Sequence, residues 1–351
     1  MKTPSVPHKN PLENITLWIP QFPAVKDRGE KSLDGLEGST KLIALQQLRA
    51  ATLLDDLQST PASFAKIAWL THWTRVFEAL NATRAALDAE VGLACGILAR
   101  ICMEQALQIQ VILDPVVTTI GENSKASTRV QLSSAAKDRY WHEAVDRLNA
   151  YAAWCLYSDA DYYRFLCDKN RLNDVWEEDS RRAILRDPTA KRMHELFYGP
   201  IEILSDAEVA LDRKKHEKGI REGLTRITSW LESSAIADWR LRIKTCTEKA
   251  RPRSITFFEL FNETEQTIRK RLTGQRLGFA YQSYQRGSLL VHGTTIEHVL
   301  GFSQDTLLPR IGDAFSDTTI DAADVADWCS HILLGLGLLK GRVFQLLDVN
   351  P

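Results

Sequence analysis

The chain has 351 residues, of which 44% are hydrophobic and 25% charged, an ordinary balance for a globular protein. Its 44 basic and 45 acidic residues give a net charge of −1, which excludes a general electrostatic attraction to nucleic acid or anionic lipid. The N-terminus lacks the apolar segment of a signal peptide, and the longest apolar stretch, 332–339, is too short to span a bilayer. The sequence therefore predicts a cytoplasmic protein without a membrane partner.

The first part of the chain is expected to be a proline-rich arm followed by helices. Five prolines interrupt residues 1–38, and proline at that density blocks helix and sheet alike. From residue 39 to 351, apolar residues recur at helical spacing, which predicts one all-helical domain. A first helix should begin at Ser39, and a second should open at Thr60-Pro61, with Trp69 and Trp73 in the core. A long central helix from about 86 to 113 should end at Asp114-Pro115.

The rest of the chain also has helical periodicity. Further helices are expected at about 130–163, 205–231, 257–272, 277–300 and 321–347, with short ones in 171–200. No stretch alternates with period two, so no sheet is predicted. The fold class is all-α: a helical bundle with a core from about 85–165 and 255–350. The charged segment of about 171–250 is expected to be a helical insertion or extension.

Several classes of enzyme lack their motifs here. The sequence contains no phosphate-binding GxxxxGK[ST] loop, no Rossmann glycine pattern and no GxSxG elbow. No histidine follows a glutamate at the Glu-x-x-His spacing of di-iron bundles, and HExxH is absent. The six cysteines include no CxxC pair, which favours free thiols in a reducing compartment. We therefore expect neither a cofactor nor a metal ion.

One late segment combines residues that can carry chemistry. Arg286 and His292 have the spacing Arg-x5-His, and Ser288 lies one helical turn before His292. A polar strip with a histidine is costly inside an apolar bundle unless it is paired or hydrated. A functional site is one interpretation, and a satisfied core histidine is the other. Tyr284 and Ser288 are expected to be hydrogen-bond partners and not nucleophiles.

A second motif lies on the predicted central helix, where Arg100 and Glu104 are one turn apart. Together with the Tyr-x2-Tyr-x3-Ser-x3-His-Gly pattern that starts at Tyr281, it resembles a bacterial family of uncharacterised helical proteins. That family looks like a branch of the HEPN superfamily, whose members are helical bundles and often ribonucleases. The resemblance covers about 85–115 and 255–300, under a third of the chain.

The resemblance implies a metal-independent endoribonuclease or RNA-binding effector, toxin-like or acting in antiviral defence. The RNA 2′-hydroxyl would attack the adjacent phosphate, with His292 as general base or acid and Arg286 stabilising the phosphate charge. It also implies a homodimer, since such sites are usually composite, and a regulatory protein partner. Glu104 would orient His292 or Arg286. Gly287 departs from the pattern, because active members commonly have a polar residue after the arginine.

Alternatives remain for the pair and for the function. The other interpretation of Arg100 and Glu104, which we prefer, is a buried structural ion pair that ties two central helices together. The rival function is a non-catalytic helical sensor or scaffold that binds a protein or a small ligand, which Gly287 and the neutral charge favour. A third function is a partner subunit that masks another enzyme.

Overall fold

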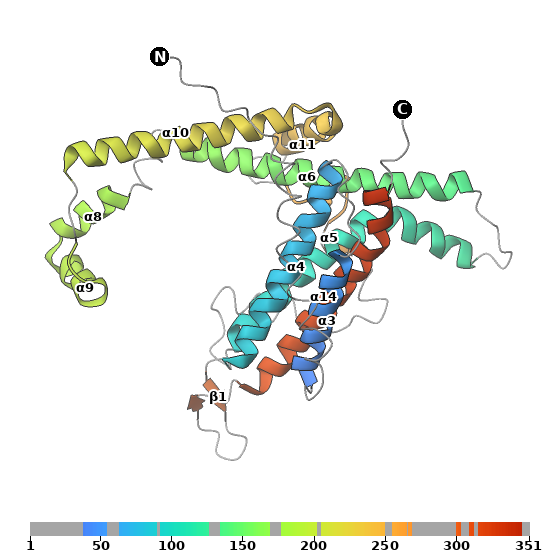
Figure 1. Cartoon of the computed structure of the whole chain (residues 1–351), viewed down its shortest axis with the longest axis horizontal. Coiled ribbons are helices and arrows are strands. Elements are labelled where there is room, and N and C mark those ends of the chain that lie inside the picture. Colours follow the sequence, from blue (N-terminus) through green and yellow to red (C-terminus); the bar gives the residue numbers. More distant parts are fainter. Residues whose placement is uncertain are drawn as a thin grey trace. The chain divides into compact units, whose positions relative to one another are not determined.

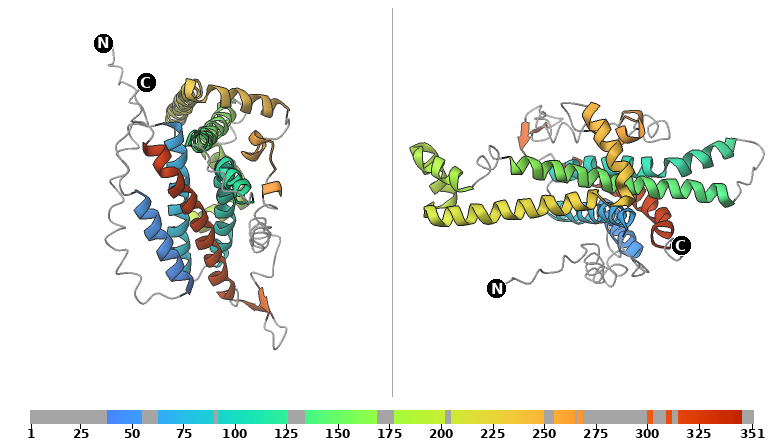
Figure 2. Two further views of the ribbon diagram at one scale, coloured as in Figure 1. Left: turned by 90° about the vertical axis from the view of Figure 1, so that its right-hand side faces the viewer. Right: turned by 90° about the horizontal axis from the view of Figure 1, so that it is seen from above.

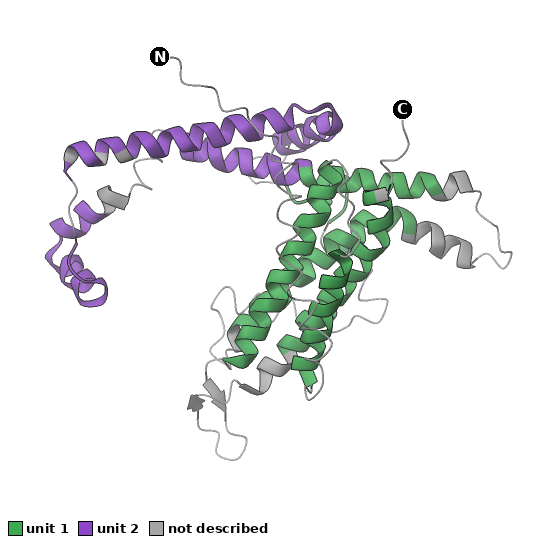
Figure 3. Cartoon of the chain, viewed as in Figure 1, with its two compact units in different colours: residues 1–152, 252–351 green, residues 153–251 purple. Residues whose placement is uncertain are grey.

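The computed structural model describes eleven segments of the chain, and they confirm the all-α fold class. These segments are residues 38–54, 63–89, 92–125, 134–168, 177–201, 205–249, 255–264, 266–268, 300–302, 309–311 and 315–345. The chain divides into two compact units, one of residues 1–152 with 252–351 and the other of residues 153–251 (Figure 3). The predicted insertion, about 171–250, falls inside the second unit. The predicted arm lies outside the described residues, apart from Gly38.

The first unit is built on four long helices. They are α3 (Gly38–Leu54), α4 (Phe64–Asp88), α5 (Gly92–Lys125) and α14 (Phe315–Gln345), and α14 packs against the other three (Figures 1 and 2). Buried tryptophans join them: Trp69 Nε1 donates to the Leu336 carbonyl at 2.9 Å, and Trp73 Nε1 to the Ala50 carbonyl at 2.8 Å. Both indole N–H groups are thus satisfied in the core, as burial of tryptophan requires.

The contacts also fix the directions of the helices. Cys95 of α5 shares a core cluster with Ala322 of α14, and Cys102 of α5 contacts Cys329 of α14. Seven residues farther along α5, the contact is thus also seven residues farther along α14. These two helices are therefore parallel, with the repeat of a coiled coil. The helix α4 runs the other way, because Trp69 meets Leu336 whereas the earlier Lys66 lies over the ring of Phe344, farther along α14.

A glycine allows the close approach of α5 and α14. A Cβ atom at Gly335 would lie 2.4 Å from Ile109 Cγ2 and 3.1 Å from Leu113 Cδ1, whereas at Gly337 the nearest atom would be 3.5 Å away. We expect Gly335→Ala to lower the free energy of unfolding by about 1–3 kcal/mol through overpacking. Gly337→Ala, on the same helix, should be neutral or stabilise by up to about 1 kcal/mol. Urea unfolding of both variants tests this, and equal effects would contradict it.

The predicted end of the central helix at Asp114-Pro115 is wrong, because α5 continues through Pro115 to Lys125. Proline lacks an N–H, so the carbonyl of Val111, four residues earlier, loses its helical donor. That carbonyl instead accepts a hydrogen bond from Arg147 Nη1 at 2.7 Å. Arg147 lies on α6 (Ser134–Cys167), whose first half belongs to the same unit. A side chain from another helix thus replaces the donor that proline removes.

Other boundaries differ from the sequence prediction. The helix α4 begins at Phe64, and its N-cap is Ser63, whose Oγ accepts from the Lys66 amide, so Thr60-Pro61 does not open it. The predicted helix at 257–272 begins as a 3-10 turn, η4 (Phe258–Phe261). A short antiparallel pair, β1 (Leu300–Phe302) with β2 (Pro309–Ile311), departs from the prediction of no sheet. Three-residue strands are too short to produce a period-two pattern.

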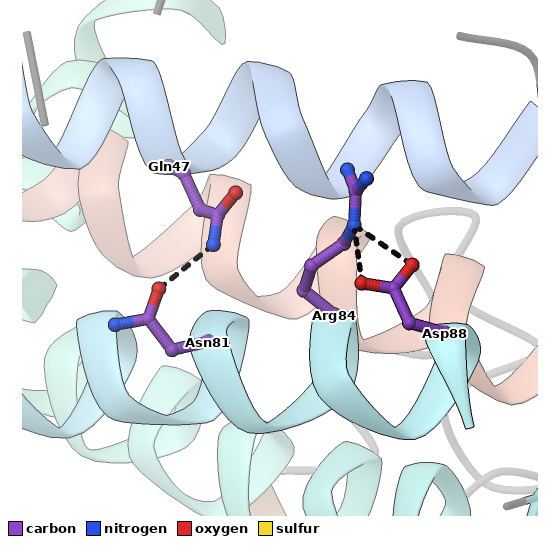
Figure 4. Close-up of polar contacts among 4 residues, drawn as sticks. All are labelled: Gln47, Asn81, Arg84 and Asp88. Atoms are coloured by element: carbon purple, nitrogen blue, oxygen red, sulfur yellow. Dashed lines mark hydrogen bonds and ion pairs between the residues drawn. The ribbon is translucent and has the colours of Figure 1, made fainter. Parts of the chain in front are cut away.

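Polar contacts occur at the surface of α3 and α4. Gln47 Nε2 donates to Asn81 Oδ1 at 2.8 Å, and Arg84 Nε meets both carboxylate oxygens of Asp88 at 3.2 Å (Figure 4). Exposed pairs of this kind contribute under about 1 kcal/mol each. The Gln47–Asn81 hydrogen bond joins the two helices, whereas Arg84 and Asp88 form an i, i+4 pair within α4.

The second unit holds the rest of α6 and the charged middle of the chain. Its elements are α8 (Glu177–Arg186), α9 (Pro188–Tyr198), α10 (Asp206–Leu231), η3 (Ser234–Ile236) and α11 (Ala237–Lys249). The predicted start at 205 is confirmed by a capping box, in which Ser205 and Glu208 satisfy each other's backbone amides. Gly223 of α10 packs against the ring of Tyr163, where a Cβ would lie 2.5 Å from Cε1.

Candidate functional site

The predicted pair on the central helix is formed. Arg100 Nε lies 3.2 Å from Glu104 Oε1, with side chains 20% and 41% exposed respectively. An i, i+4 pair with this much solvent contributes only about 0.3–0.5 kcal/mol to stability. The pair therefore adds little to the stability of the bundle.

The pair begins a polar strip on α5. We define this strip as Arg100, Glu104 and Gln108, which follow one another at four-residue spacing and share one face. The Gln108 Oε1 atom is buried and has no hydrogen-bond partner among the described residues, and the same holds for Oε1 of the neighbouring Gln105. Unsatisfied buried acceptors are costly, so this face of α5 is suited to a polar partner.

The four residues of the late motif, Tyr284, Arg286, Ser288 and His292, lie outside the described residues. Of the six predicted site residues, the structure brings together Arg100 and Glu104. The Arg100–Glu104 pair is therefore the part of the predicted site that the structure describes.

A buried histidine is a feature that the sequence prediction missed. His72 on α4 is fully buried, and neither ring nitrogen has a hydrogen-bond partner among the described residues. Its ring lies against Tyr151 of α6, with centroids 4.2 Å apart, and the Tyr151 hydroxyl accepts from Arg75 Nη1 at 2.6 Å. Burial, and then the nearby Arg75 charge, lower the pKa of His72 to about 3. This histidine is therefore neutral at physiological pH.

The position of His72 could have been suspected from its neighbours. It follows Trp69 by three residues and precedes Trp73, and both tryptophans are buried as predicted. A histidine on the apolar face of a central helix is either paired or neutral. Among the described residues, neither ring nitrogen of His72 has a hydrogen-bond partner with which it could exchange a proton.

Two further groups were not anticipated. Arg147 meets Glu143 at 3.1 Å and Asp114 at 3.9 Å, and its guanidinium lies over the ring of Phe261 at 4.7 Å. The Sγ atoms of Cys102 and Cys329 are 3.7 Å apart and fully buried. Hydrogen bonding to Cys102 and burial raise the pKa of the Cys329 thiol well above its usual range, which makes it a poor nucleophile.

No cluster of three or more histidine, cysteine, aspartate or glutamate side chains suited to a metal ion occurs within the segments described. Two helical stretches, Ala94–Val116 and Asp321–Phe344, are long and apolar enough to cross a bilayer. Both belong to helices that pack against each other, α5 and α14, and a core helix of a bundle can have the same length and composition.

Comparison with known proteins gives no relative from which a function could be transferred. No family model matches the chain, and no curated protein or solved structure is significantly similar to it. A function must therefore be inferred from the residues themselves.

Proposed function

We propose that the protein is a metal-independent, HEPN-type RNA-cutting effector, acting in the cytoplasm as a homodimer and held inactive by a regulatory partner. The observation that supports it most is the Arg100–Glu104 pair on α5, and the sequence adds the late Arg286-x5-His292 motif. The unsatisfied amide oxygen of Gln108 on the same face of α5 agrees with a polar partner there.

The proposed chemistry needs few groups. RNA supplies its own nucleophile, so a base, an acid and a cation are enough. His292 would move the proton, and Arg286 would hold the phosphate through its permanently charged guanidinium. Glu104 would be a positioning residue that orients one of them, with Ser288 and Tyr284 as hydrogen-bond partners.

The test is RNA cleavage by the purified full chain in excess EDTA. We expect wild type to leave a cyclic phosphate end and Arg286→Ala/His292→Ala to lose about 10²- to 10⁴-fold in rate. His142→Ala is the matched control, because that histidine lies exposed on α6 and should not affect cleavage. Intact RNA with wild type at high protein concentration would overturn the proposal.

Glu104→Gln separates positioning from structure. The substitution keeps the size of the side chain and removes its charge. A positioning role predicts a shifted pH–rate profile, whereas a structural ion pair predicts an unchanged profile and a change in stability of about 0.5 kcal/mol or less.

The second candidate is a non-catalytic scaffold. It is favoured by a specific surface, the exposed apolar side chains of α9, which are typical of a protein that binds other proteins. Intact RNA together with a stable protein complex would support this function.

A further inference from the structure

Two buried thiols contact each other where α5 and α14 pack side by side in the first unit (Figures 1 and 2). The Cys329 thiol donates to the Cys102 sulfur, with the two Sγ atoms 3.7 Å apart, and neither side chain is exposed. A buried cysteine often serves only as a small apolar side chain. Here each sulfur lies against a second sulfur, with which it can form a covalent bond.

The register of the two helices keeps these cysteines opposite each other. Because α5 and α14 are parallel and follow a heptad repeat, Cys102 and Cys329 belong to the same layer of the seam, one heptad after Cys95 and Ala322. A disulfide requires the sulfurs to approach to about 2.05 Å. Rotation of the two side chains can bring them together, and neither helix has to slide along the other.

The two helices also approach closely enough for a disulfide. Near Cys329 on α14, Gly335 packs so tightly against Ile109 that a Cβ atom there would lie 2.4 Å from Cγ2. Small residues at a contact allow helix axes to approach to about 8 Å. At that separation, facing Cα atoms lie within the range of about 4.4–6.8 Å that a disulfide spans.

We propose that Cys102 and Cys329 form a disulfide that ties α5 to α14 when the protein meets a small-molecule disulfide such as oxidised glutathione. In a first exchange, one cysteine thiolate attacks the oxidised glutathione, giving a mixed disulfide and one reduced glutathione. The other cysteine thiolate then attacks the protein sulfur of the mixed disulfide and releases the second glutathione. The two protein thiols lose two protons and two electrons in all, and the two glutathione molecules receive them.

Burial determines when this exchange can occur. Hydrogen bonding to Cys102 and burial raise the pKa of the Cys329 thiol well above its usual range. The nucleophilic thiolate is therefore scarce until α5 and α14 separate briefly. The same burial protects the finished disulfide from reductants. The site is thus a latch that is closed, and released, only when the two helices open.

The test is incubation of the full chain in a buffer of oxidised and reduced glutathione, with and without urea just below the unfolding transition. Urea increases helix opening, so the bond should form at least about tenfold faster in its presence. Digestion without reductant should yield linked peptides that contain Cys102 and Cys329, whatever happens at the half-buried Cys155, Cys167 and Cys246. The linked protein should unfold at a urea concentration roughly 1 M higher than the same sample after reduction, because the cross-link restricts the unfolded chain.

Cys102→Ala and Cys329→Ala should each abolish both the linked peptides and the urea shift. Either variant is sufficient if circular dichroism shows that the other does not fold. Cys95→Ala is the matched control, because it removes a buried thiol from the neighbouring layer of α5 and should leave both results intact.

Three results would overturn the proposal: wild type without the link between Cys102 and Cys329 at equilibrium, links that join other cysteines in its place, or a urea shift that persists in Cys102→Ala. A link that forms equally fast without urea would overturn the dependence on helix opening. Neither thiol belongs to the proposed RNA site, so these measurements and the nuclease test can fail independently.

Discussion

Wild type should lose stability steeply as the pH falls from about 6.5 toward 3, and His72→Phe should remove a large part of that loss. The pKa of His72 is lowered to about 3 in the folded protein by burial and by Arg75, whereas the ordinary value of 6.5 applies after unfolding. Below pH 6.5 the unfolded chain therefore binds a proton that the folded chain cannot bind. The contribution of His72 to the free energy of unfolding is fully present above pH 6.5, decreases as the pH falls from 6.5 to 3, and does not change further below pH 3.

The expected size is large for one side chain. A difference of 3.5 pKa units at 1.36 kcal/mol each corresponds to about 5 kcal/mol when fully developed, and to about 3 kcal/mol at pH 4. Phenylalanine keeps the ring against Tyr151 and has no proton to bind. It also removes two buried nitrogens that have no described partner, so at pH 7 the variant should be at least as stable as wild type.

The measurement is urea unfolding of both proteins at several pH values between 7 and 4. Other groups titrate in both proteins alike, so the difference between the two curves isolates His72. His142→Phe is the control, because it removes an exposed histidine and should leave the pH dependence of wild type intact. Parallel curves for wild type and His72→Phe would show that the buried ring does not govern acid stability.

Local signals in the sequence predicted the elements that depend on local contacts. Ser205 and Glu208 are three residues apart, and the capping box they form marks the start of α10 as predicted. The apolar spacing around Trp69 and Trp73 predicted the buried face of α4, and the i, i+4 spacing predicted that Arg100 and Glu104 would pair. In each case both partners lie within one or two helical turns.

The missed features depend on partners far away in the chain. The neutral state of His72 follows from its burial against Tyr151, which is 79 residues away on another helix. No local pattern in the sequence predicts that the rings of His72 and Tyr151 are in contact. Arg286 and His292 lie outside the described residues, so the site that they would form remains a prediction from spacing and resemblance.

The continuation of α5 through Pro115 also depends on a residue far away in the sequence, Arg147. We expect substitution of Arg147 to have the second large effect on the stability of the protein. The Arg147 side chain is 16% exposed and donates to the Val111 carbonyl that proline leaves without a donor. It also lies near the Asp114 carboxylate and over the Phe261 ring. We expect Arg147→Met to lower the free energy of unfolding by about 2–4 kcal/mol, from the unsatisfied carbonyl and the lost cation–π contact.

The loss should shrink if the proline is removed first. In Pro115→Ala the residue at 115 regains an N–H that can donate to the Val111 carbonyl, so Arg147→Met should cost about 1–3 kcal/mol less in that background. Urea unfolding of the four proteins in this double-mutant cycle measures the coupling directly. Additive effects would show that Arg147 stabilises the protein through its other contacts, with Glu143, Asp114 and Phe261, and not through the Val111 carbonyl. A coupling of the expected sign would establish that a side chain 36 residues away allows the central helix to pass a proline.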